Sequence, residues 1–166
     1  MNDYEITRAK MISEELGYIA FTADIYGADM HDIQDFQVKV SQATLYRSDP
    51  DLFNSRIESA IAVVKSVPFV DPDRVAIIGY CLGGTGVIGY SFANTVGSFS
   101  DSDIVGGVSF HGGLMDFDVT GEMASPVLVL SGGNDDAGTA VEELESKFKQ
   151  ANATWQITRY SGACYK

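Results

Sequence analysis

The sequence predicts an α/β protein with a doubly wound, mostly parallel sheet flanked by helices. Helical and strand-like patterns alternate along all 166 residues, and the strand-like segments are short apolar runs bounded by turn residues. Nearly continuous apolar runs such as VLVL at 127–130 are typical of parallel strands covered on both faces. The length fits one domain spanning 1–166, and a hydrophobic content of 45% is enough to build its core.

The first half of the chain is expected to be mainly helical. Asn2 or Asp3 can cap a first helix whose apolar residues recur every three or four positions, and Gly17 ends it. The sequence SDP at 48–50 ends one helix and starts the next. The expected elements are a helix up to residue 16, a strand at 18–24, a loop at 25–31, a helix at 33–46 and a helix at 51–66.

The second half alternates more strictly between strands and helices. The expected elements are a strand at 75–78, a helix at 85–94, a strand at 104–110, a loop at 111–125, a strand at 126–131, a helix at 141–151 and a strand at 155–160. In open parallel sheets, ligands bind at the carboxyl ends of the strands. Cys81, His111 and the polar loop at 132–136 should therefore gather at one edge of the sheet.

The net charge and the cysteine content limit which binding partners and which cellular compartment are expected. The net charge of −12 argues against nucleic acid or an anionic membrane as a partner, because both need a cationic surface. We find neither a secretory signal nor a membrane-spanning run in the sequence. The two cysteines are too few for a disulfide framework, and a catalytic thiol must stay reduced, so a cytoplasmic location is expected.

The sequence AIIGYCLGG at 76–84 has the layout of a nucleophile elbow, a sharp turn between a buried strand and a helix that presents a nucleophile. Gly79 and Gly83 are expected to permit the strained turn and the close packing of strand against helix. Cys81 at the tip is then the candidate nucleophile. The alternative is a small buried apolar residue, which is the usual role of a free cysteine.

Two further residues are candidates for the same site. Asp135 follows a buried strand in a glycine-rich loop and can orient a catalytic base; the alternative is a helix cap, a role that suits the adjacent Asp136. The chain has only two histidines, and His111 ends the strand after the elbow. For His111 a partly buried supporting role is favoured over that of catalytic base.

Together these segments resemble the dienelactone hydrolase family of the α/β-hydrolase superfamily, over essentially the whole chain. The matching sequences are ELGY and ADIYG before residue 28, GYCLGG at 79–84, VSFHG at 108–112, VLVLSG with Asp135, and YSGA at 160–163. The resemblance implies a Cys-His-Asp triad that hydrolyses small lactones or esters without a cofactor. It assigns Cys81 as nucleophile, Asp135 as triad acid and the backbone N–H of Leu82 as one oxyanion-hole donor.

Two departures from the family pattern bear on activity. The triad histidine would fall at Tyr165, and a phenol is a poor general base at neutral pH. The family's first strands, including the neighbour of the elbow strand and the loop with the second oxyanion donor, have no counterpart. Three explanations stay open: the strand at 18–24 closes against the elbow strand, a second copy completes the sheet as a homodimer, or the sequence is a fragment, which we favour.

The expected function is hydrolysis of a small ester or lactone through a cysteine acyl-enzyme, impaired by the missing histidine, with His111 and Tyr165 as further pocket residues. The alternative is a non-catalytic binding or assembly protein of the same fold. A weaker alternative is a redox pair of Cys81 with Cys164. Scattered histidines and cysteines predict no metal site, and the glycines at 83–84 lack the lysine of a phosphate-binding loop.

Overall fold

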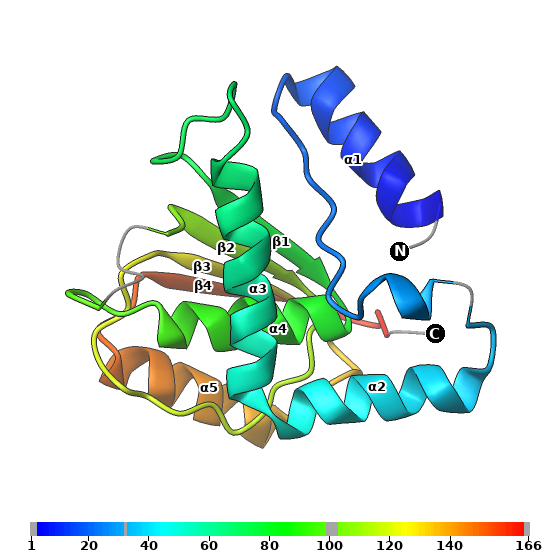
Figure 1. The fold of residues 1–166 in the computed structure, drawn as a ribbon. Coiled ribbons are helices and arrows are strands. Elements are labelled where there is room, and N and C mark those ends of the chain that lie inside the picture. Colours follow the sequence, from blue (N-terminus) through cyan, green and yellow to red (C-terminus); the bar gives the residue numbers. More distant parts are fainter. Residues whose placement is uncertain (1–2, 32, 99–102, 165–166) are drawn as a thin grey trace. The chain divides into compact units, whose positions relative to one another are not determined.

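A computed structural model describes residues 3–31, 33–98 and 103–164 of the protein. The chain divides into two compact units, Met1–Val70 and Asp71–Lys166 (Figure 1). Whether they form the single domain expected from the sequence stays a prediction. Within the described ranges, no helix has the length and apolar character needed to cross a membrane.

The first unit contains the helices that the sequence predicts. They are α1 (Asp3–Leu16), α2 (Phe36–Ser48) and α3 (Pro50–Lys65). A short 3-10 helix (Ala28–Met30) lies within the segment predicted to be a loop. Gly17 ends α1 with a φ of 72°, which glycine adopts without strain. Asp49 closes α2 and caps α3, because its carboxylate accepts a hydrogen bond from the N–H of Leu52 at 2.9 Å.

The predicted strand at 18–24 is wrong, because no ladder partner is present for it in the described sheet. Strand propensity is realised only when a neighbouring strand accepts the backbone hydrogen bonds. The segment instead leads into a turn held by Asp24, whose carboxylate accepts from the N–H of Gly27 at 3.1 Å and lies 2.8 Å from Nε2 of His31. The described sheet therefore contains no strand from residues 18–24.

The second unit is a parallel sheet with flanking helices, which confirms the predicted fold class. Its strands pair in the order β1-β2-β3-β4, every neighbouring pair parallel. Its elements are β1 (Ala76–Tyr80), α4 (Leu82–Ala93), β2 (Gly106–Phe110), β3 (Val127–Gly132), α5 (Gly138–Gln150) and β4 (Trp155–Tyr160). The elbow strand β1 is an edge strand of this four-stranded sheet, with β2 beside it (Figure 1).

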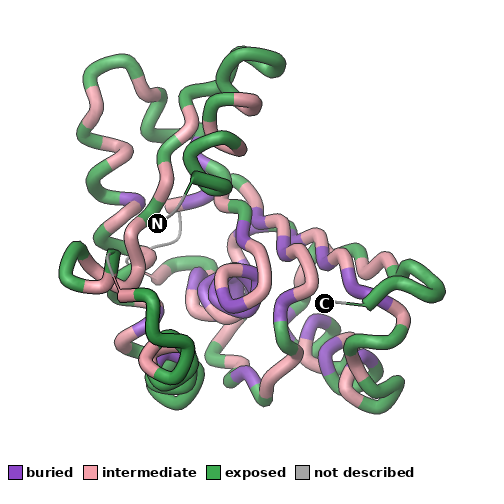
Figure 2. The backbone as a smooth tube through the Cα atoms, turned by 90° about the vertical axis from the view of Figure 1, so that its right-hand side faces the viewer, coloured by how far each residue is buried: buried purple, intermediate pink, exposed green. Residues whose placement is uncertain are grey.

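The core of this unit lies between one face of the sheet and the helices α4 and α5. Val127 and Val129 of β3 pack there with Phe92 of α4 and Phe148 of α5, whose rings stack with centroids 5.1 Å apart. Nine of the 12 residues of α4 are buried (Figure 2). On the opposite face of β1, Ile78 is 45% exposed, so the helices of this unit cover one face only.

The long loop between β2 and β3 is tied to α5 by Lys147. Its ammonium donates to the carbonyl of Phe117 and pairs with Asp116 at 2.6 Å. The hydrogen bond from Lys147, together with its charge, lowers the pKa of Asp116 below the ordinary value. The Phe117 ring is buried against Phe92, which anchors the loop on the core.

Candidate active site

Cys81 occupies a strained turn between β1 and α4. Its φ of 53° and ψ of −116° lie in a region that residues other than glycine rarely adopt. It is the residue before the first turn of α4, and it is partly exposed rather than deep in the core. Strained backbone of this kind clusters at functional sites, where surrounding structure enforces it. The geometry is the strand, turn and helix that the elbow motif requires.

The glycines around the elbow have distinct roles. A Cβ at Gly79 would overlap the carbonyl of Gly83, so glycine is needed where strand and helix meet. Gly83 itself faces open space, and the expectation that its missing side chain permits close packing is wrong. That role belongs to Gly84, where a Cβ would lie 2.8 Å from the carbonyl oxygen of Phe110 and 2.8 Å from Cα of Gly112.

The carboxyl ends of the strands are joined by backbone hydrogen bonds beyond the strands themselves. The N–H of Cys81 donates to the carbonyl of Phe110 at 3.0 Å, and the N–H of His111 donates to that of Leu130 at 2.7 Å. His111 also has a positive φ, 41°. These bonds place Cys81 beside the end of β2 and His111 beside the end of β3, along one edge of the sheet.

The loop that carries Asp135 is fastened to the end of β4. The N–H of Gly133 donates to the carbonyl of Tyr160 at 2.8 Å, and the N–H of Asn134 donates to that of Ala163 at 3.1 Å. The guanidinium of Arg159 donates to the carbonyls of Gly133 and Asp136, each at 3.1 Å. The loop is thereby held over the turn that follows β4.

Asp135 and Asp136 point in different directions from this loop. A Cβ on Gly132 would overlap the Asp135 carboxylate, so that side chain folds back over the Gly132 backbone. Asp136 accepts a hydrogen bond from the buried Ser131 hydroxyl at 2.9 Å. The N-cap of α5 is Ala137, whose side chain makes no capping hydrogen bond. The suggestion that Asp136 caps this helix is therefore wrong.

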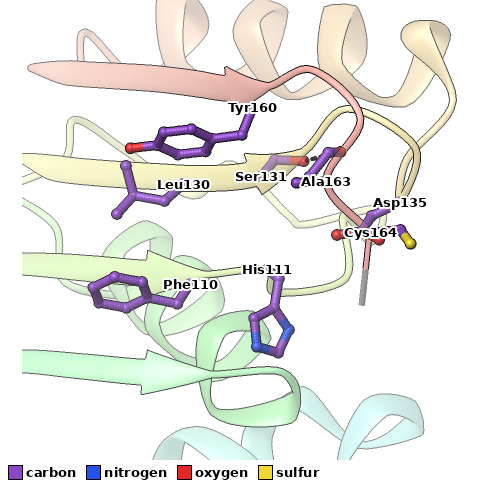
Figure 3. Close-up of a pocket in the computed structure, with 9 residues that line it drawn as sticks. Phe110, His111, Leu130, Ser131, Asp135, Tyr160, Ala163 and Cys164 are labelled. Carbon is purple, nitrogen blue, oxygen red and sulfur yellow. Dashed lines mark hydrogen bonds between the residues drawn. The ribbon is translucent and has the colours of Figure 1, made fainter. Parts of the chain in front are cut away.

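A pocket of about 390 Å³ opens at this edge of the sheet (Figure 3). His111 and Asp135 line it, as the sequence led us to expect for a common site. The other lining residues are Phe110, Leu130, Ser131, Gly132, Tyr160, Ala163 and Cys164. The sequence analysis did not place Phe110, Leu130 and Tyr160 in a pocket, although period-two alternation along three predicted strands would have put them on one face.

Cys81 is not among the residues that line this pocket; it lies two strands away from β3, with β2 between. With strands about 4.8 Å apart, the backbones of β1 and β3 are separated by about 10 Å. His111 directly follows β2, the strand that lies between them. Leu82 is the buried first residue of α4, where backbone N–H groups have no acceptor within the helix.

Tyr165, the residue at the position of the triad histidine, lies outside the described residues. Cys81 and Cys164 are both free thiols in the structure. Among the described residues, no three His, Cys, Asp or Glu side chains come close enough together to hold a metal ion. The described residues at this edge thus include the Cys81 thiol at the elbow and, in the pocket, the His111 imidazole, the Asp135 carboxylate and the Cys164 thiol.

A parallel sheet whose edge strand turns sharply into a buried helix, with an acidic loop two strands away, defines a fold of the α/β-hydrolase type. The chain matches the profile of the Dienelactone hydrolase family over residues 2–165 and belongs to that family. Family membership thus confirms the resemblance inferred from the motifs.

Solved structures similar to the chain include two of this kind. One is a dienelactone hydrolase-like promiscuous phosphotriesterase from metagenomic libraries, with 25% identity and a TM-score of 0.84 over 98% of this chain and 65% of that one. The other, m3DLH, has 26% identity and a TM-score of 0.85 over 99% of this chain and 66% of that one. The chain thus spans just under two thirds of the length of either.

A phospholipase/carboxylesterase from Dyadobacter fermentans shares the fold, with 17% identity and a TM-score of 0.56 over 76% of this chain and 60% of that one. Among curated proteins, none matches the chain.

Proposed function

We propose that this protein is a cysteine hydrolase of small lactones or carboxylic esters, with Cys81 as the nucleophile. The observation that carries the proposal is the strained backbone of Cys81 at the amino terminus of α4. Membership of the dienelactone hydrolase family supports it. Since a catalytic thiol must stay reduced, the proposal includes a reducing compartment, the cytoplasm.

The reaction needs two displacements at the same carbonyl carbon. The Cys81 thiolate attacks that carbon, a C–S bond forms, and the negative charge moves to the carbonyl oxygen, where the N–H of Leu82 can donate to it. Collapse breaks the C–O bond, and the leaving alkoxide or enolate takes a proton. Water then attacks the thioester, which releases the carboxylic acid and restores the thiol.

Proton transfer to and from a general base is the step expected to limit turnover. Asp135 is fixed in a loop from which its carboxylate can orient a base, but the position expected to supply the triad histidine is Tyr165. His111 lines the same pocket as Asp135 and is the imidazole available there. We therefore expect acylation to be observable and turnover to be slow.

The experiment is acylation of the protein by para-nitrophenyl acetate. Mass spectrometry of the intact chain should show one added acetyl group, and nitrophenolate release should begin with a burst equal to the enzyme concentration. Cys81→Ala should abolish both signals, whereas Cys164→Ala, the matched control, should retain them. Acetylation that persists in Cys81→Ala would contradict the proposal and favour a binding protein that merely shares the fold.

A further inference from the structure

We infer that a row of apolar side chains across the sheet binds the aliphatic acyl chain of the substrate, and that Leu130 sets the preference for longer chains. This inference names the substrate class of the proposed hydrolase, esters of unbranched aliphatic acids, and rests on that function. It follows from the strand register, from the stacking of two rings and from the position of Cys81 at one end of the row.

The apolar row crosses the four described strands near their carboxyl ends. Tyr80 of β1 pairs with Phe110 of β2, and Phe110 pairs with Leu130 of β3. On β4, Tyr160 stands two positions beyond Thr158, the residue that pairs with Leu130. Residues that pair in register, or that are two positions apart on one strand, point to the same face of a sheet. The side chains of Tyr80, Phe110, Leu130 and Tyr160 therefore share one face and form the apolar row.

This row offers apolar surface to a ligand. The rings of Tyr80 and Phe110 stack with centroids 4.7 Å apart. Phe110, Leu130 and Tyr160 form one wall of the pocket, where they follow one another on three neighbouring strands (Figure 3). Tyr160 is 52% exposed, and Phe110 and Leu130 are half-buried. An alkyl chain lying on the row would thus remove apolar area from water on both partners.

The proposed nucleophile stands at one end of the row. Cys81 directly follows Tyr80, and its N–H donates to the carbonyl of Phe110 at 3.0 Å. The acyl carbon bound to this thiol would therefore lie near the β1 end of the row. The alcohol must leave before water attacks the thioester, so the acyl chain is the part of the substrate that stays bound through both displacements. The row is thus suited to hold the acyl chain rather than the alcohol.

Strand spacing relates the length of the acyl chain to the side chains that it contacts. Neighbouring strands are about 4.8 Å apart and a C–C bond is about 1.5 Å long, so about four bonds are needed to advance by one strand. A butanoyl chain therefore reaches no farther than Phe110, whereas an octanoyl chain extends over Leu130. A methylene fully removed from water strengthens binding about fourfold, and one covered on a single side about twofold.

The first test follows acylation of Cys81 by the para-nitrophenyl esters of acetic, butanoic and octanoic acid at concentrations below micelle formation. Each rate constant is divided by that of N-acetylcysteine with the same ester, which corrects for the reactivity of the ester itself. We expect the corrected rate constant to rise about tenfold from butanoate to octanoate. Equal corrected rate constants, abolished by Cys81→Ala, would overturn the inference and leave the proposed function intact.

Leu130→Gln and Leu128→Gln are a matched pair of variants for the role of Leu130. Both residues are half-buried and lie on the same face of β3, but Leu128 is farther from the carboxyl end and is not among the described lining residues. The ratio of the octanoate to the acetate rate constant cancels any loss of folded protein. This ratio should fall about fivefold or more in Leu130→Gln and should be kept in Leu128→Gln. The same ratio in both variants would contradict the role of Leu130.

A second test requires no hydrolysis. Nonan-2-one carries the same alkyl chain as an octanoyl group, and pentan-2-one carries that of a butanoyl group. In Cys81→Ala protein with labelled methyl groups, nonan-2-one should shift the NMR signals of Leu130 more than those of Leu128, and pentan-2-one should shift them less. Leu130 signals that do not respond to nonan-2-one would overturn the inference whatever the hydrolytic activity. Ketone binding at Leu130 in a protein that none of the three esters acylates would count against the proposed function instead.

Discussion

Cys81, the proposed nucleophile, has the most strained backbone of the elbow. A φ of 53° with a ψ of −116° costs a residue other than glycine of the order of 1–3 kcal/mol. The cost persists because Gly79 allows the helix to pack directly on the strand, and because the Cys81 N–H is bonded to Phe110. The surrounding packing therefore fixes the direction of the thiol.

Gly84 and Gly83 offer a matched pair for testing that packing. Gly84→Ala would drive a Cβ to 2.8 Å from backbone atoms of Phe110 and Gly112, whereas a Cβ at Gly83 meets nothing within 4 Å. We expect Gly84→Ala to lower the free energy of unfolding by about 2 kcal/mol or more. Gly83→Ala should be neutral or stabilising by up to about 1 kcal/mol, since alanine favours helix. Urea denaturation of both variants measures the difference; equal stabilities would contradict this account of the elbow.

Tyr165 occupies the position at which the family resemblance predicts the triad histidine, the general base. If the family pattern places a general base at this position, Tyr165→His should raise kcat/KM for para-nitrophenyl acetate by roughly a hundredfold. The gain should grow as pH rises through the titration of imidazole near pH 6.5, because only the neutral ring accepts a proton. Tyr165→Phe is the control and should change little. A Tyr165→His protein no faster than its parent at any pH would show that His111 or water already fills this role.

Among the elements, the loop after β3 depends most on its neighbours. Two backbone N–H groups of this loop donate to carbonyls of β4 and its turn, and Arg159 supplies two further bonds. Such a loop keeps Asp135 in place only as long as the end of β4 is in place. The loop that holds Asp135 and the turn after β4 are thus fixed by the same hydrogen bonds.

Arg159→Ala should loosen the loop at 133–136 without removing a side chain that lines the pocket. We expect faster amide hydrogen exchange at 133–136 and slower deacylation of Cys81, with a stability loss of about 1 kcal/mol. Gln156→Ala, an exposed position earlier on β4, serves as the control. Unchanged exchange at 133–136 in Arg159→Ala would mean that the backbone bonds alone hold the loop.

At the scale of the whole molecule, the open question is whether the two compact units behave as the one domain that the length predicts. Trp155, the only tryptophan of the chain, reports on the second unit, where it stacks on Phe148. Helices of both units contribute to far-ultraviolet circular dichroism. If the units form one cooperative domain, thermal transitions followed by fluorescence and by circular dichroism should coincide. A helical transition at lower temperature than the tryptophan transition would show that the first unit unfolds independently.

Local patterns were sufficient for most elements. The caps at Asp49 and Gly17 and the apolar runs of β2 and β3 predicted their elements because these signals act within a few residues. The segment at 18–24 shows where such reasoning fails, since its apolar character is compatible with a strand but its backbone partners must come from elsewhere in the molecule.

The sequence by itself determined the parallel α/β class, the turn that carries Cys81 and the grouping of His111 with Asp135, because each follows from short-range patterns and from the direction of parallel strands. Only the tertiary structure decided that Gly84 rather than Gly83 permits the close approach, that Asp136 bonds Ser131, and that Phe110, Leu130 and Tyr160 form one wall. Those outcomes depend on distances between elements far apart in the chain, which packing and strand register set together.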